Sequence, residues 1–221
     1  IYYDNFKNSQ LKRLVTGGEK LNISNIEKRN YIFVDEYGPT ENTVTSTVKY
    51  IRSIEDTQSI GRPLGNVKVY IVDQNNNLCP IGVPGEICLS GNQLAKGYWN
   101  NPELTKNKFV DNPFNKNLDA SCNKMYHTGD LAKWLPNGEI QFLGRVDFQV
   151  KIRGFRIELG EIEVAMAAID TINEAIVTTK KDPNGKDYLA GYFVADEQID
   201  VAWLKQALQN VLPEYMIPQY L

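Results

Sequence analysis

The sequence predicts a mixed α/β and α+β protein in three parts: the end of a parallel α/β subdomain, a β-barrel-like subdomain, and a small α+β subdomain at the C-terminus. Three observations predict this order. Near the start, two continuous apolar runs end in glycine, as buried parallel strands do. The middle of the chain holds short β-branched segments between turn signals. The last third alternates strands with two amphipathic helices, which is typical of a two-layer unit.

Residues 1–43 are expected to be the end of the α/β core subdomain. "LKRLVTGG" (11–18) and "NYIFVDEYG" (30–38) each read as a strand followed by a glycine turn, with an irregular connection between them. Ligands bind outside the carboxyl ends of parallel strands. The two glycine turns therefore indicate where a binding site is expected.

Residues 44–146 are expected to form the β-rich, barrel-like subdomain. One short helix is predicted over residues 101–110, because Pro102 suits the first helical turn and Glu103 suits the helix dipole. The glycines of residues 85–105 do not form a dinucleotide-binding fingerprint, since no G-x-G-x-x-G opens a helix there. Strands are predicted at "TSTVKYI", "VKVYIVD", "GEICLSG" and "EIQFLGR".

Residues 147–221 are expected to form a hinge and the C-terminal α+β subdomain. "FQVKIRGFRI" reads as a hairpin with Gly154 at its turn. A second hairpin is predicted around Pro183-Asn184-Gly185, and a second helix after Asp200 as its N-cap. The first helix is predicted from the apolar face formed by Leu159, Ile162, Met166 and Ile169.

The composition argues against nucleic-acid binding and against a membrane protein. The net charge of −3 and the pI of about 5.4 give no basic field that would recruit nucleic acid or an anionic membrane. No apolar run approaches the roughly 18 residues of a membrane span. Cys79, Cys88 and Cys122 match neither a zinc-site spacing nor a redox pair, so free thiols in a reducing cytoplasm are expected rather than disulfides.

The segment "YGPTE" (37–41) combines groups that suit a nucleotide triphosphate. The ring of Tyr37 can stack on a base, and Gly38 lets the backbone approach a ligand closely. The Thr40 hydroxyl can donate to a phosphate oxygen, and the Glu41 carboxylate can hold a Mg²⁺ that bridges phosphates. The competing interpretation is a proline-containing turn with Glu41 in solvent.

The segment "YHTGDL" (126–131) supplies a second set of polar groups. Gly129 after Thr128 predicts a turn, and Asp130 can accept from both hydroxyls of a ribose at about 1.5–3 kcal/mol for each charge-assisted bond. A simple turn cap is the alternative for Asp130. His127, the single histidine, is read as a strand-edge residue over the site rather than a general base.

The stretch of residues 142–163 is rich in charged residues. Arg145 can complement Asp130 by binding ribose or phosphate, and Asp147 is placed to act as a hinge. Lys151, Arg153 and Arg156 alternate into a basic edge, for which a solvated face is the competing interpretation.

Taken in order, these motifs resemble the amino-acid adenylation domains of nonribosomal peptide synthetases, in the adenylate-forming superfamily of acyl-CoA synthetases. The resemblance spans essentially the whole chain. Its motifs are "TGGE" (16–19), "YGPTE" (37–41), "GEICLSGNQLAKGYW" (85–99), "YHTGDL" (126–131), "GRVDFQVKIRGFRIELGEIE" (144–163) and "LPEYMIP" (212–218).

The resemblance implies an adenylate-forming ligase with two half-reactions. An amino acid reacts with Mg·ATP to give aminoacyl-AMP and pyrophosphate. The C-terminal subdomain then rotates, and a phosphopantetheine thiol on a peptidyl carrier protein takes the aminoacyl group. Neighbouring synthetase domains are implied as partners, and peptide antibiotics are typical products.

The resemblance also implies roles for individual residues. Thr40 and Glu41 are implied in catalysis, with Glu41 holding Mg²⁺, while Asp147 is the hinge and Lys151 and Gly154 form the thiolation loop. The ATP- and AMP-binding residues it implies are Gly18, Glu36, Tyr37, Gly38, Thr40, Asp130, Phe142 and Arg145. The implied substrate pocket is lined by Val15, Gly17, Glu36, Val44 and Thr45.

The chain departs from the family pattern at both ends. The family's phosphate-binding loop, the aspartate for the substrate amino group and the catalytic lysine after "LPEYMIP" are not in the sequence. The mobile C-terminal subdomain is thus expected to be incomplete, and this stretch alone to have little adenylation activity. Alternatives are a D-alanine or acyl-CoA ligase of the same superfamily, or a non-catalytic fragment that docks a carrier protein.

Overall fold

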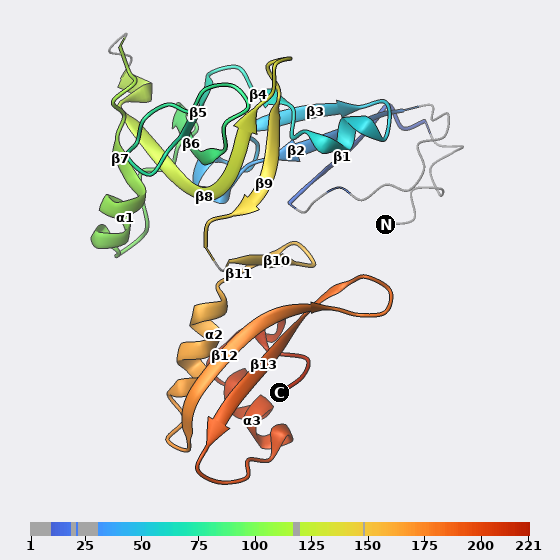
Figure 1. Ribbon diagram of the computed structural model, residues 1–221, viewed down its shortest axis with the longest axis vertical. Coiled ribbons are helices and arrows are strands. Elements are labelled where there is room, and N and C mark those ends of the chain that lie inside the picture. The colour runs from blue at the N-terminus through green and yellow to red at the C-terminus, as the bar shows by residue number, and fades with distance from the viewer. Residues whose placement is uncertain (1–9, 19–20, 22–30, 117–119, 148) are drawn as a thin grey trace. The chain divides into compact units, whose positions relative to one another are not determined.

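A computed structural model describes residues 10–18, 21, 31–116, 120–147 and 149–221. The chain divides into two compact units, Ile1–Val146 and Asp147–Leu221, which are called unit 1 and unit 2 (Figure 1). The expected division of residues 1–146 into two subdomains at residues 43 and 44 stays a prediction.

The first sheet of unit 1 has the strand order β1-β2-β3-β4. β1 (Arg13–Gly17) and β2 (Ile32–Tyr37) are parallel, as the two apolar runs predict. β3 (Thr47–Ile51) and β4 (Arg62–Pro63) extend the sheet in antiparallel pairing, so one sheet runs across the expected boundary after residue 43. Apart from Leu21, the expected connection over residues 19–30 lies outside the described residues.

The second sheet of unit 1 curls around a long central strand, β8 (Lys124–Trp134), which is visible in Figure 1. β8 pairs with β6 (Gly85–Gly91) along one side, and with β7 (Phe109–Asp111) and β9 (Ile140–Arg145) along the other. β5 (Val67–Val72) pairs with β6 and completes the sheet. Short helix α1 (Pro102–Lys108) precedes β7, with Asn101 as its N-cap.

Two predictions about β8 are wrong. Gly129 forms no turn between strands, because it lies inside this 11-residue strand with a left-handed φ of 76°. The pairing of β8 with β6 shifts register between Glu86 and Cys88, opposite the segment that contains Gly129. His127 is not on an edge strand either, since β8 pairs with β6 along one side and with β7 and β9 along the other.

Two of the hydrophobic clusters of unit 1 lie on the two faces of β6. Ile87 and Leu89 pack with Val67, Ile71, Ala132 and Ile140 on one face, while Cys88 packs with Val72 and Met125 on the other. Tyr37 of the first sheet belongs to the first of these clusters, so its ring ties the two sheets together. Burial on both faces explains the continuous apolar run Ile87–Leu89 in the middle of β6.

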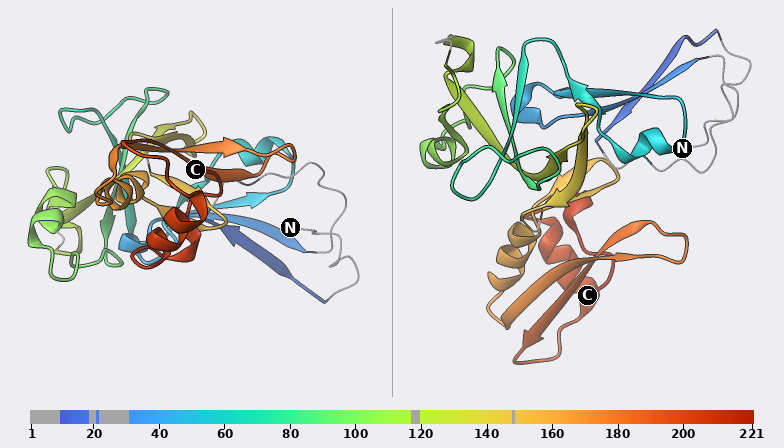
Figure 2. Two further views of the ribbon diagram at one scale, coloured as in Figure 1. Left: turned by 90° about the horizontal axis from the view of Figure 1, so that it is seen from below. Right: turned by 45° about the horizontal axis from the view of Figure 1, so that its top comes forward.

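Unit 2 is a two-layer α+β unit, and the predicted hairpin, helix, hairpin and helix are confirmed (Figures 1 and 2). Both helices pack against one core with the longer hairpin, although Ile169 lies beyond the end of its helix. Asp200 caps the second helix by accepting from the Ala202 N–H at 2.9 Å. The elements are β10 (Val150–Ile152), β11 (Phe155–Ile157), α2 (Leu159–Ala167), β12 (Ile172–Lys181), β13 (Asp187–Ala195) and α3 (Val201–Gln209).

Two further sequence expectations concern cysteines and membranes. Cys79, Cys88 and Cys122 are all free thiols. Among the described residues, no helix has the length and apolar character needed to span a bilayer.

Candidate active site

Tyr37, Asp130 and Arg145 meet in unit 1, although they are far apart in sequence. The Tyr37 hydroxyl donates to Asp130 Oδ2 at 2.5 Å, and Arg145 Nη1 donates to Asp130 Oδ1 at 2.5 Å. β8 and β9 place Asp130 directly opposite Arg145, and the end of β2 brings Tyr37 to the same carboxylate. Arg145 Nη2 also donates to the Thr128 carbonyl at 3.2 Å.

This ion pair is shielded from solvent. The side chains of Arg145 and Asp130 are only 13% and 9% exposed. Burial, followed by the negative charge of Asp130, raises the pKa of Tyr37 well above its usual value, so the phenol stays a donor. Asp130 is thus an oriented carboxylate that accepts from both Tyr37 and Arg145.

Phe142 adds an aromatic wall beside this cluster. It lies on β9, and its ring centroid is 6.1 Å from that of Tyr37 at a tilt of 43°. This spacing is within the range of favourable aromatic pairs. Two aromatic rings, one acid and one arginine thus line the same region of unit 1.

The loop after Tyr37 folds back tightly on itself. Thr40–Asn42 form a 3₁₀ turn, and the Ser46 N–H donates to the Tyr37 carbonyl at 2.7 Å. A Cβ on Gly38 would lie 2.3 Å from the Val44 carbonyl oxygen and 2.7 Å from the Ser46 nitrogen. Gly38 is therefore required by close approach of backbone to backbone.

Gly38→Ala is expected to lower the free energy of unfolding by about 1–2 kcal/mol, because the added methyl must push the Val44 carbonyl away. Chemical denaturation monitored by circular dichroism measures this change. Gly65→Ala is the matched control, since no atom lies within 4 Å of a Cβ built there. Equal stability of the two variants would contradict the close-approach explanation.

Glu41 is held by a hydrogen bond from Tyr98, which lies outside its own motif. The Tyr98 hydroxyl donates to Glu41 Oε1 at 2.7 Å and lies 3.3 Å from the hydroxyl of the buried Tyr126. Burial, and then the neighbouring Tyr126 and Glu41, raise the pKa of Tyr98 far above its usual value. The sequence predicts Tyr98 and Trp99 as an aromatic anchor between β-barrel turns, but it does not indicate the contact with Glu41, which spans 57 residues.

Tyr98→Phe is expected to lower the free energy of unfolding by about 1–2 kcal/mol, because the Glu41 carboxylate loses a charge-assisted hydrogen bond. Thermal and denaturant unfolding measure the effect. Tyr50→Phe serves as the control, since Tyr50 is half exposed, and should change stability by less than about 0.5 kcal/mol. A Tyr98→Phe protein as stable as the control would show that the Glu41 contact contributes little.

Gln93 clamps the same loop from the segment after β6. Its side-chain Nε2 donates to the carbonyls of Asn42 at 3.0 Å and Thr45 at 2.6 Å. Thr43 Oγ1 donates back to the Gln93 carbonyl at 2.7 Å. The clamp holds two β-branched residues in left-handed backbone, Thr43 with φ 52° and Val44 with φ 70°. Such conformations cost of order 1–3 kcal/mol each and persist only where neighbouring contacts impose them.

Four of the five expected substrate-pocket residues lie on β1 or β2 or hydrogen-bond to them, whereas the fifth, Val44, does neither. Gly17 pairs with Glu36, and Thr45 Oγ1 donates to Glu36 Oε2 at 2.7 Å. A Cβ on Gly17 would lie 2.6 Å from the Glu36 carbonyl oxygen, so β1 and β2 approach closely there. Val15 and Glu36 line a cavity of about 630 Å³ over the first sheet, whereas Val44 is 68% exposed.

Two expected nucleotide-binding residues lie in the loops after β1 and β2. Gly18 has a left-handed φ of 91°, and Thr40 is exposed.

The remaining expected functional residues belong to unit 2. Asp147 opens the unit and accepts from the Gln149 N–H at 3.2 Å. Lys151 lies on β10 and is exposed. Arg153 and Gly154 form the two-residue turn of the hairpin, with φ of 54° and 80°. Phe155 next to this turn stacks on Tyr215, with ring centroids 4.2 Å apart.

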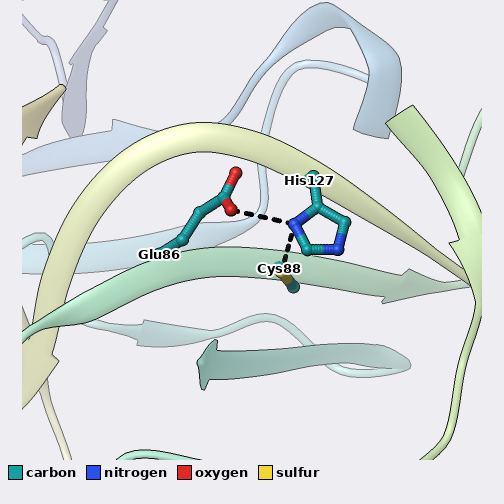
Figure 3. A group of neighbouring side chains, drawn as sticks. All are labelled: Glu86, Cys88 and His127. Atoms are coloured by element: carbon teal, nitrogen blue, oxygen red, sulfur yellow. Dashed lines mark hydrogen bonds and ion pairs between the residues drawn. The ribbon is translucent and has the colours of Figure 1, made fainter. Parts of the chain in front are cut away.

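His127 has a partner that the sequence analysis did not find. Its Nδ1 lies 2.9 Å from Glu86 Oε2 and 3.4 Å from Cys88 Sγ (Figure 3). Burial raises the pKa of the Glu86 carboxyl, but the contact with His127 and the Gly129 N–H outweigh burial and lower that pKa overall. Burial raises the pKa of the Cys88 thiol.

Comparisons with known proteins agree with this geometry. Residues 2–99 match the family described as AMP-binding enzyme. Tyrocidine synthase 3 of Brevibacillus parabrevis is 47% identical over 215 residues, which are 95% of this chain and 3% of that protein. Bacitracin synthase 1 of Bacillus licheniformis is 47% identical over 213 residues, covering 96% of this chain and 4% of that protein.

A solved structure gives the same result for the fold. PA1221, described as a nonribosomal peptide synthetase protein containing adenylation and PCP domains, has a TM-score of 0.77 and 26% identity. The match covers 95% of this chain and 42% of that structure. The chain thus spans a few per cent of the length of the curated relatives and under half of this adenylation protein. Together, these matches show that the chain belongs to the AMP-binding enzyme family, among the adenylation domains of nonribosomal peptide synthetases.

Proposed function

We propose that this chain is part of an enzyme that activates an amino acid with Mg·ATP to aminoacyl-AMP and pyrophosphate, and that loads it on a phosphopantetheinyl carrier protein. The observation that carries the proposal is the shielded carboxylate of Asp130, to which both Tyr37 and Arg145 donate hydrogen bonds. A shielded acid beside aromatic rings suits a nucleoside, whose ribose offers two hydroxyls and whose base offers a flat face.

Each residue of this cluster has a distinct task in the proposal. Asp130 accepts from the ribose hydroxyls, while Arg145 keeps that acid ionised and oriented. Tyr37 and Phe142 form the wall beside the base, and Gly38 lets the following backbone lie close to it. Because the cluster is already hydrogen-bonded, the ribose meets a preorganised acceptor.

Glu41 and Thr40 are proposed to act at the phosphates of the nucleotide. Mg²⁺ is bound in proteins by one or two carboxylates together with phosphate oxygens and water, so the carboxylate of Glu41 fits this metal. Mg²⁺ supplies charge neutralisation to the phosphates when it is bound. Tyr98 donates to Glu41 Oε1 and so helps to hold this carboxylate in place. Thr40, which is exposed, is proposed to donate its hydroxyl to a phosphate oxygen.

Other residues are proposed to bind the amino acid and to act in the second half-reaction. Val15, Gly17, Glu36, Val44 and Thr45 are proposed to line the side-chain pocket of the amino acid. Asp147 is proposed as the hinge of unit 2, and Lys151 with the turn at Gly154 as the thiolation loop. A two-residue turn with two left-handed residues is rigid, which suits a loop that must present a defined shape.

Titration of the chain with AMP tests the nucleotide assignment. We expect AMP to bind, and the 2′,3′-dideoxy analogue of AMP to bind at least tenfold more weakly because it offers Asp130 no hydroxyl. Isothermal titration calorimetry measures both affinities. Asp111→Asn, a change at an exposed ion pair with Lys124, should leave AMP binding unaltered. Equal affinity for AMP and its dideoxy analogue would refute the role of Asp130.

A further inference from the structure

Three side chains of different chemistry converge on one point of the second sheet of unit 1. Glu86 and Cys88 are two residues apart on β6, so they project to the same face. The strand register places His127 of β8 directly opposite Cys88. Figure 3 shows the three side chains directed toward one another, and their ligand atoms all lie within 4.8 Å of one another.

A hydrogen bond between Glu86 and His127 explains only part of this arrangement. His127 Nδ1 lies 2.9 Å from Glu86 Oε2 and 3.4 Å from Cys88 Sγ, so one ring nitrogen faces two other heteroatoms. A single Nδ1 proton can be donated fully to only one of them. A metal ion at the same position would bond to all three atoms at once.

We propose that Glu86, Cys88 and His127 form a zinc site with three protein ligands and a fourth position for water. Zinc bonds of about 2.0–2.1 Å to nitrogen and oxygen and about 2.3 Å to sulfur, at tetrahedral angles, require N···S and N···O separations of about 3.6 Å and about 3.3 Å. The observed N···S and N···O separations are 3.4 Å and 2.9 Å, a few tenths of an ångström below these values, and the Glu86 oxygen and Cys88 sulfur lie within 4.8 Å of each other.

The ligand types select the metal. A thiolate and an imidazole favour zinc over magnesium or calcium, which prefer oxygen ligands alone. The second oxygen of Glu86 accepts from the Gly129 N–H at 2.8 Å, which orients the carboxylate as outer contacts do in metal sites. The side chains of His127 and Glu86 are 15% and 25% exposed, so water can reach the fourth position.

Metal binding has a defined proton balance. Zinc takes the place of the thiol proton of Cys88, which is released to solvent as the zinc–sulfur bond forms. His127 binds zinc through Nδ1, so its neutral ring carries the proton on Nε2. Because His127 lies three residues before Asp130 on β8, the ion would fasten β6 to β8 beside the proposed nucleotide site.

Zinc titration of the 221-residue chain tests the site. His127 is the single histidine, so its imidazole ¹⁵N signals report ligation without any substitution. We expect one equivalent of zinc to compete with a chromophoric chelator and to shift the Nδ1 signal. We also expect cobalt to give thiolate charge-transfer absorption. No binding at micromolar zinc, or binding that leaves the His127 signals unchanged, would overturn the proposal.

Matched variants assign the ligands. Cys88→Ser and Glu86→Gln should each weaken zinc binding at least tenfold, whereas Cys79→Ser, outside the cluster, should not change it. Equal weakening by Cys79→Ser would count against the assignment. Circular dichroism of each variant confirms that the fold is kept, and the signals of His127 in the unaltered chain give a second readout if a variant fails to fold.

Discussion

Asp130→Asn is expected to lower the free energy of unfolding by about 3–5 kcal/mol, because it leaves the guanidinium of Arg145 shielded from solvent without its counter-charge. The Arg145 side chain is only 13% exposed, and its Nη1 lies 2.5 Å from the carboxylate that the change neutralises. The variant keeps the size of the side chain, so a cavity contributes little. Urea unfolding at neutral pH measures the loss, and AMP binding should be lost with it.

A second substitution separates charge burial from ligand binding. In Asp130→Asn combined with Arg145→Met, both charges are absent, so a large part of the lost stability should return. AMP binding should not return, because the acceptor for the ribose is still missing. Asp111→Asn at an exposed ion pair should cost less than about 1 kcal/mol. A double variant as unstable as Asp130→Asn alone would show that the loss does not arise from the unpaired arginine.

Asp35→Asn is expected to raise the free energy of unfolding by roughly 2–3 kcal/mol at pH 8. Asp35 lies on β2 and is 9% exposed, and burial raises its pKa to about 6 although the Glu36 N–H lowers it slightly. An acid whose pKa is higher in the folded chain than its unfolded value near 3.9 stabilises the fold at low pH. That contribution is lost as the pH rises from about 4 through about 6.

The pH dependence supplies the control for this variant. Below about pH 4, Asp35 is protonated in both states, so the variant and the unaltered chain should differ little. Between about pH 4 and pH 6 the gap should widen, and above that range it should be constant. Denaturant unfolding across this pH range measures the gap. An Asp35→Asn variant that is less stable than the unaltered chain at pH 8 would contradict the burial argument.

Much of the fold follows from local sequence signals. The parallel pair β1 and β2 is encoded by two continuous apolar runs, and the hairpin at Arg153 and Gly154 by its glycine. β8 was harder to predict, because Gly129 within it looks like a turn residue. In the structure, β6 and β9 pair with β8 near this glycine and keep the strand continuous, which local propensity cannot indicate.

The site follows from the sequence in part only. Tyr37, Asp130 and Arg145 are polar or aromatic residues in recognisable motifs, and the structure brings them together. Tyr98 and Gln93 give no comparable signal, because their roles depend on contacts to residues about 50 or more positions away. The Glu86, Cys88 and His127 cluster depends on the β6–β8 register, which no spacing rule within one strand reveals.

The clamp made by Gln93 has a consequence for how this region opens. The Ala95 N–H donates to the Glu41 carbonyl at 2.8 Å, and the Gln93 side chain holds the carbonyls on either side of the left-handed pair. Detaching either segment breaks these hydrogen bonds to the other. We therefore expect residues 41–46 and 93–95 to open as one cooperative unit, whose amides become accessible to solvent in a single event.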